Sequence, residues 1–151
     1  MQTAKQLFEK LTSISAKDFY QVEADLFMLL QEIPDDAKSD VVVAFLTISN
    51  WKGTSLRSGV WTFYESAQQK DLQITTVYLT NAGQTELAEV FSRGIHDYQN
   101  PMYAESFDYP SEWMDEADKI DHWISTHEHW LDTWMRNLLL YNRETVIALF
   151  S

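Results

Sequence analysis

The sequence contains no cysteine, and only four glycines and three prolines among its 151 residues. The absence of cysteine excludes disulfides, thiol catalysis and zinc sites with cysteine ligands, and it fits a reducing compartment. Because glycine and proline mark turns, their scarcity predicts few turns and long elements, which favours helices. We therefore expect an all-α fold, with residues 1–151 forming a single acidic domain of about six to eight helices.

Basic residues are also scarce, since eleven Lys and Arg stand against 23 Asp and Glu, a formal net charge of −12. Nucleic acids and anionic membranes attract Lys and Arg, so neither is an expected direct partner. No stretch approaches the roughly 18 apolar residues of a membrane span, and the first residues lack an apolar signal core. We expect a cytoplasmic protein with a true core, built from its 45% hydrophobic residues.

Familiar catalytic patterns are missing as well. The chain has no Gly-rich phosphate loop, no G-x-S-x-G turn and no HExxH motif. The sequence therefore predicts no catalytic residue and no cofactor, and it favours a binding function over an enzyme.

Hydrophobic spacing predicts the first helices. Leu7 and Leu11 belong to a short one, and a second ends before Pro34. The run Val-Val-Val-Ala-Phe-Leu-Thr-Ile within residues 41–51 has strand-like propensity but helical spacing, so helix and strand both stay open, with helix preferred. Ser39 or Asp40 is the expected N-cap of this helix.

Turn residues divide the middle of the chain. Gly53 and Gly59 are expected to bracket a turn, and Asp71 to cap the helix that follows. Gly83 stands where a helix ends in a left-handed residue. The Asn-Pro and Tyr-Pro pairs within residues 99–110 predict the one clear loop of the chain.

What the sequence has in abundance is acid near its C-terminal end. Between residues 105 and 132, the acidic segment, Lys119 is the only base. The acids of this segment are Glu105, Asp108, Glu112, Asp115, Glu116, Asp118, Asp121, Glu128 and Asp132. Tryptophans of the kind found in cores alternate with them, which predicts a folded negative surface rather than a loose acidic tail.

A helix starting near Ser111 would place Trp113, Ile120 and Ile124 on one face and Asp118 and Asp121 on the other. An amphipathic helix with a solvated back explains this pattern. The alternative is a negative surface that docks a basic partner. Nine acids over about 42 Å of helix give one per ~4.7 Å, sparser than the ~3.4 Å spacing of phosphates along one DNA strand. An imitation of DNA would therefore need a second acidic row, such as Glu86, Glu89 and Asp97.

Histidines within the acidic segment raise the question of a metal. Asp118 and His122 form an i, i+4 pair, but His129 would stand two turns, or ~10.5 Å, from His122 on an unbroken helix. First-shell distances near ~2.0–2.1 Å cannot be met at that separation. The run from Ser125 to Glu128 reads as a capping box, so the helix is also able to restart there and move His127 and His129.

A family resemblance is carried by three stretches. Residues 58–65 read Ser-Gly-Val-Trp-Thr-Phe-Tyr-Glu, and residues 78–83 and 86–91 form an apolar helix, a glycine turn and an alanine-containing helix. Over residues 40–98 the chain thereby resembles a bacterial all-helical family of largely unknown function that includes a DNA-mimic protein. The turn that the family writes Asn-Gly-Gly reads Arg-Ser-Gly at residues 57–59 here. The resemblance implies a DNA-binding regulator as partner, engaged through acidic residues.

Three functions follow, in order of preference. The first is an acidic protein-binding domain that docks a basic protein, either as a DNA-mimic regulator or as the inhibitor of a nucleic-acid-binding protein or toxin. The second is a metal-dependent enzyme that uses the cluster Asp118, His122, Glu128, His129 and Asp132. The third is a homo-oligomeric structural module without catalysis, in which Tyr103, Phe107 and Tyr109 make a homodimer contact.

Overall fold

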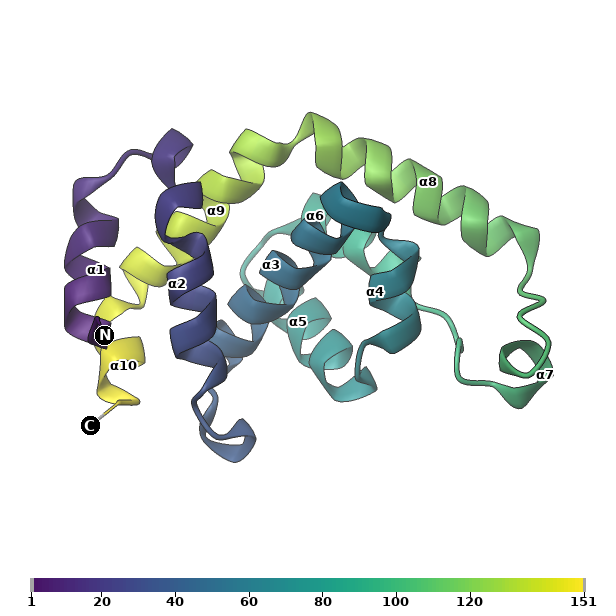
Figure 1. Cartoon of the computed structure of the whole chain (residues 1–151), viewed down its shortest axis with the longest axis horizontal. Helices are drawn as coiled ribbons and strands as arrows, with labels where there is room; N and C mark the ends of the chain where they lie inside the picture. The colour runs from purple at the N-terminus through teal and green to yellow at the C-terminus, as the bar shows by residue number, and fades with distance from the viewer. Residues whose placement is uncertain (1, 151) are drawn as a thin grey trace. The chain divides into compact units, whose positions relative to one another are not determined.

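The computed structural model describes residues 2–150, which contain helices and no strand (Figure 1). The all-α expectation is confirmed, but the number of helices is higher than expected. The described residues form ten α-helices and two short 3₁₀ helices, because several of the expected segments are divided by brief turns. The chain separates into two compact units, one from Met1–Ser49 with His127–Ser151 and one from Asn50–Thr126. The single domain stays a prediction.

The first unit combines the two ends of the chain. Its helices are α1 (Ala4–Ser13), α2 (Tyr20–Gln31), the first part of α3 (Asp40–Ser58), α9 (Glu128–Tyr141) and α10 (Arg143–Ala148), with the 3₁₀ helices η1 (Ala16–Asp18) and η2 (Asp35–Ala37). Helix α1 packs against α2, α9 and α10 (Figure 1). The core includes Phe8, Leu26, Phe45 and Met135, all fully buried.

Both local signals and a distant side chain fix where the helices of this unit begin and end. Thr3 and Gln6 form a capping box at the start of α1. At the other end, the Arg136 guanidinium donates two hydrogen bonds, of 3.1 and 2.8 Å, to the carbonyl oxygen of Ile14. A cation suits this position because the C-terminal carbonyls of a helix carry partial negative charge. Helix α2 ends before Pro34, as expected.

The second unit is the middle of the chain. It contains the rest of α3, α4 (Trp61–Ser66), α5 (Gln69–Asn81), α6 (Thr85–Arg93), α7 (Pro101–Ala104) and α8 (Ser111–Thr126). Helix α6 packs against both α5 and α8. At its centre the Trp51 indole donates a 2.8 Å hydrogen bond to the Tyr64 hydroxyl, which in turn donates to the Phe91 carbonyl at 2.6 Å. All three side chains are buried.

The ambiguous run at residues 41–51 is helical and belongs to α3, with the Ser39 hydroxyl accepting from the Val42 N–H at 3.4 Å. The residues from Val42 to Phe45 are all buried. A helix that is buried on most of its surface loses the polar stripe that would identify it, which explains its strand-like composition.

Three smaller expectations are wrong. Gly53 lies inside α3 rather than in a turn, Asp71 lies inside the first turn of α5 rather than at its cap, and the loop at residues 99–110 contains α7. The expectations for Gly59 and Gly83 hold, since both have positive φ, at 97° and 78°. No helix in the described part of the chain is both long and apolar enough to cross a membrane.

Candidate functional site

The nine acids of the acidic segment are divided between the two units. Seven of them, from Glu105 to Asp121, belong to the second unit, whereas Glu128 and Asp132 lie on α9 in the first. Between α8 and α9 the helix breaks at His127, whose φ and ψ are −123° and 17°. The restart expected near Ser125 is therefore present, but His127 rather than Ser125 precedes α9, and no side chain caps it.

One stretch of the second unit has acids and no base at all. Residues 94–118, the base-free segment, contain no Lys or Arg. Its acids are Asp97, Glu105, Asp108, Glu112, Asp115, Glu116 and Asp118. All except Glu116 are exposed, and among the described residues none of these six exposed acids has an ion pair. Their charge is therefore not neutralised by neighbouring side chains.

Aromatic rings hold the base-free segment together. Trp113 on α8 stacks on His96, with ring centroids 4.5 Å apart and planes 6° from parallel. It also contacts Tyr98 at 5.0 Å and Tyr103 at 5.2 Å. We call this group the aromatic cluster; its members are Trp61, His96, Tyr98, Tyr103, Tyr109 and Trp113. Edge-to-face and offset pairs of this kind stabilise beyond the area that they bury.

The centre of the aromatic cluster is Tyr98, which is only 2% exposed. Burial raises the pKa of Tyr98 to about 12, and the nearby Glu116 carboxylate adds to the shift. Glu116 is the one acid of the base-free segment with a partner, because its Oε2 lies 3.2 Å from His96 Nε2. A phenol that keeps its proton adds no negative charge to the base-free segment.

Three apolar side chains of the base-free segment are exposed: Met102 by 72%, Phe107 by 77% and Met114 by 42%. Phe107 also has a φ of 53°, an outlier for a bulky residue. The dimer contact expected through Tyr103, Phe107 and Tyr109 stays a prediction, but the two tyrosines are less exposed than it assumes. Both are half-buried and belong to the aromatic cluster, whereas Phe107 is exposed.

The local backbone fixes where these apolar side chains lie. The Asn100 side chain accepts a 3.0 Å hydrogen bond from the Met102 N–H, and Pro101 occupies the first position of α7. The Asp108 N–H donates to the Tyr103 carbonyl at 3.3 Å, which closes the turn that contains Phe107. The exposed side chains thus stand on an ordered support.

Asp121 plays a structural role that the sequence analysis missed. Its Oδ1 accepts a 2.6 Å hydrogen bond from the Ser55 hydroxyl and a 2.8 Å bond from the Val60 N–H. The half-buried carboxylate on α8 thereby ties down the turn between α3 and α4. No local signal in the sequence marks this role, because the partners lie about 60 residues away in the chain.

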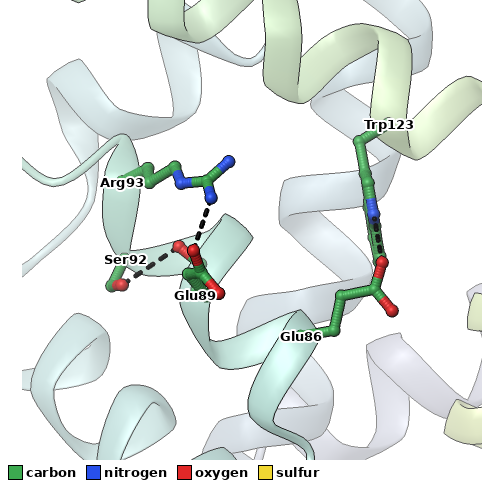
Figure 2. A network of polar contacts seen from close by, with 5 residues as sticks. All are labelled: Glu86, Glu89, Ser92, Arg93 and Trp123. Atoms are coloured by element: carbon green, nitrogen blue, oxygen red, sulfur yellow. Dashed lines mark hydrogen bonds and ion pairs between the residues drawn. The ribbon is translucent and has the colours of Figure 1, made fainter.

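Two acids of the row expected on the preceding helix, Glu86 and Glu89, have partners within the fold (Figure 2). Glu86 on α6 accepts a 3.2 Å hydrogen bond from the Trp123 indole of α8. One turn later Glu89 forms an ion pair with Arg93. Asp97, the third member, lies beyond the end of α6 at Arg93; it is exposed and has no ion pair among the described residues.

The candidate metal ligands are not brought together. No group of three or more His, Asp or Glu that could hold a metal ion exists among residues 2–150. Asp118 and His122 lie exposed on α8, and His129 is exposed on α9.

Comparisons of the chain with models of protein families, with curated proteins and with solved structures found no match.

Proposed function

We propose that this protein binds a basic protein surface through the base-free segment. The expected partner is a nucleic-acid-binding regulator or a toxin. The protein would occupy the surface with which that partner binds DNA, or would inhibit the partner, and it would do so in the cytoplasm. The observation that carries the proposal is the set of six exposed acids without ion pairs among the described residues. Carboxylates that lack internal partners are free to meet the lysines and arginines of another protein.

The exposed apolar side chains support the same function. Charged rims steer and orient a partner, whereas affinity comes mostly from a few apolar or aromatic anchors at the centre of an interface. Met102 and Phe107 are exposed between acids, with Glu105 and Asp108 next to them in the chain. Exposed apolar side chains among acids offer a basic partner the apolar contact that charged groups alone do not provide.

The DNA-mimic form of the proposal rests on the family resemblance and on charge spacing. A DNA mimic must first present a surface with negative charge only. The six exposed carboxylates lie in a stretch of chain without a base and meet this requirement. The second row on α6 contributes less than expected, because Glu89 is neutralised by Arg93. Inhibition of a basic protein requires no such row, so it fits the observed charges with fewer conditions.

The test compares two variants of matched chemistry. The first neutralises three of the six exposed acids of the base-free segment, with Glu105→Gln, Glu112→Gln and Asp118→Asn. The control neutralises three exposed acids of the other unit, with Glu9→Gln, Asp36→Asn and Glu144→Gln. Asp121 and Glu116 are left intact because both have partners within the fold. Each variant is immobilised and used to capture proteins from a bacterial extract, which are then eluted with a salt gradient.

We expect the wild-type and control columns to retain basic proteins that salt releases, and the first variant to lose them. Affinity of a purified captured protein should fall by about tenfold or more in that variant, as removal of several interfacial charges implies. Equal retention of basic proteins by the two variants would contradict the proposal. So would captured proteins that stay bound at about 1 M salt, where the Debye length is only ~3 Å.

A further inference from the structure

A groove lies between α1 and α2 in the first unit. Its volume is about 330 Å³, at the lower end of the roughly 300–1,000 Å³ found for ligand pockets. Leu7 of α1 and Met28 and Leu29 of α2 supply its apolar lining, with Gln2 at one end. Met28 is 56% exposed, although nothing about its position on α2 requires a large apolar side chain to face solvent.

Three lining residues of α2 and its C-cap, Glu32, follow a single stripe. Asp25, Met28, Leu29 and Glu32 stand at i, i+3, i+4 and i+7, and therefore share one face of the helix. The two apolar residues lie in the middle, and an acid stands at each end, about 10.5 Å apart along the axis.

Charge determines what this stripe can accept. Helix α2 contains no Lys or Arg, and among the described residues neither Asp25 nor Glu32 has an ion pair. An occupant with the complementary pattern has two apolar side chains in the middle and a basic side chain at each end. On a helix this is the spacing Lys-x-x-Leu-Leu-x-x-Lys, which repeats the distance between the two carboxylates.

We propose that the α1–α2 groove is a second binding site, which takes an amphipathic basic helix of a partner protein. The apolar pair of the incoming helix packs on Leu7, Met28 and Leu29, and its two bases pair with Asp25 and Glu32. Methionine suits such a site because its flexible thioether adapts to different side chains. This site lies in the first unit and does not depend on the base-free segment of the second.

The test uses a synthetic 16-residue peptide with one Lys-x-x-Leu-Leu-x-x-Lys stretch and Ala and Gln elsewhere. It is titrated into the full-length ¹⁵N-labelled protein while amide chemical shifts are recorded. We expect saturable shifts in α1 and α2. Two control peptides, one with Glu in place of both Lys and one with Ser in place of both Leu, should leave these amides unchanged.

Matched variants locate the site. Met28→Lys removes an apolar side chain from the groove and should weaken binding by about tenfold, the cost of one well-placed contact. Val77→Lys changes a side chain of similar exposure, 51%, on α5 and should have no effect. The pair Asp25→Asn and Glu32→Gln should also weaken binding, whereas Glu9→Gln with Asp36→Asn should not.

Three results would overturn the groove. These are the absence of saturable shifts in α1 and α2, equal binding by Met28→Lys and Val77→Lys, and equal binding of the Lys and Glu peptides. A peptide that shifts only residues 94–118 would overturn the groove and leave the proposed function standing, so the two failures are distinct. Circular dichroism of each variant shows that its helices are intact.

Discussion

Gly94 shows how a single residue is held by the packing around it. A Cβ atom at this position would lie 2.2 Å from the Tyr64 ring, far inside van der Waals contact. The ring cannot move aside easily, because its hydroxyl is fixed between the Trp51 indole and the Phe91 carbonyl. Gly94→Ala should therefore reduce the free energy of unfolding by about 1–3 kcal/mol, as overpacking of a core does. Urea denaturation followed by circular dichroism measures the change.

Gly53 provides the control for this substitution. It lies inside α3, and a Cβ atom there would meet nothing within 4 Å. Gly53→Ala should raise the free energy of unfolding by about 0.5–1 kcal/mol, since alanine is the better helix former. If both variants unfold at the same urea concentration as the wild type, the close contact between Gly94 and Tyr64 is refuted.

The roles of Gly94 and Asp121 could not be predicted from the sequence. Composition identifies a glycine or an aspartate, but its partner is set by packing between distant helices, as with Asp121 and Val60. The buried aromatics are different. Phe8, Trp51 and Phe91 could be assigned to the core from hydrophobicity alone, because residues of this kind are seldom left in water.

At the scale of the helix, the hydrophobic periodicity of the sequence predicts that a helix exists better than it predicts the residues where that helix begins and ends. The start of α8 at Ser111 and the end of α2 before Pro34 follow from local signals. Helix α7 was missed because Asn-Pro is typical of a turn, but an Asn cap followed by Pro is also how a helix begins. The helix breaks at His127, and Trp130 in the first turn of α9 is 41% exposed.

The aromatic cluster predicts how the protein responds to alkali. The pKa of Tyr98 is raised to about 12 in the fold, whereas a tyrosine in an unfolded chain titrates near ~10. Below pH ~10 the Tyr98 phenol keeps its proton in both the folded and the unfolded state, and its contribution to stability is complete. Between pH ~10 and ~12 only the unfolded state loses it, so the free energy of unfolding should fall as the pH rises.

Tyr98→Phe tests this assignment. The variant cannot ionise at this position, so its free energy of unfolding should decline less steeply than that of the wild type across this pH range. Tyr141→Phe serves as the control, because the Tyr141 side chain is 84% exposed. Denaturant titrations at about pH 9, 10 and 11, around the pKa of ~10 of a tyrosine in an unfolded chain, compare the three proteins. Equal slopes for Tyr98→Phe and the wild type would refute the role of Tyr98.

At the scale of the whole chain, excess acid is present in both units. Residues 50–126 contain twelve acids and five bases, and the rest of the chain contains eleven and six. Like charges repel within a compact state, and salt screens that repulsion. We therefore expect the midpoint of thermal unfolding to rise when sodium chloride is increased from about 10 mM, where the Debye length is ~30 Å, to about 1 M, where it is ~3 Å.

The variant with Glu105→Gln, Glu112→Gln and Asp118→Asn should show a smaller rise with salt, because it carries less charge to screen. A midpoint that falls with salt would mean that favourable ion pairs outweigh the repulsion. Excess acid could be predicted from composition, but its grouping could not. The acidic segment looks continuous in sequence, yet the break at His127 assigns Glu128 and Asp132 to a different unit from Asp118.

The base-free segment also limits how it can be mapped by mass spectrometry. Trypsin cuts only after lysine and arginine, and the nearest such residues are Arg93 at the end of α6 and Lys119 within α8. Trypsin therefore releases all rings of the aromatic cluster except Trp61 in one long anionic peptide. A label on any carboxylate of the base-free segment is found in this same peptide. Locating a protected carboxylate will require a protease that cleaves beside aromatic or acidic residues, applied after the fold has been opened.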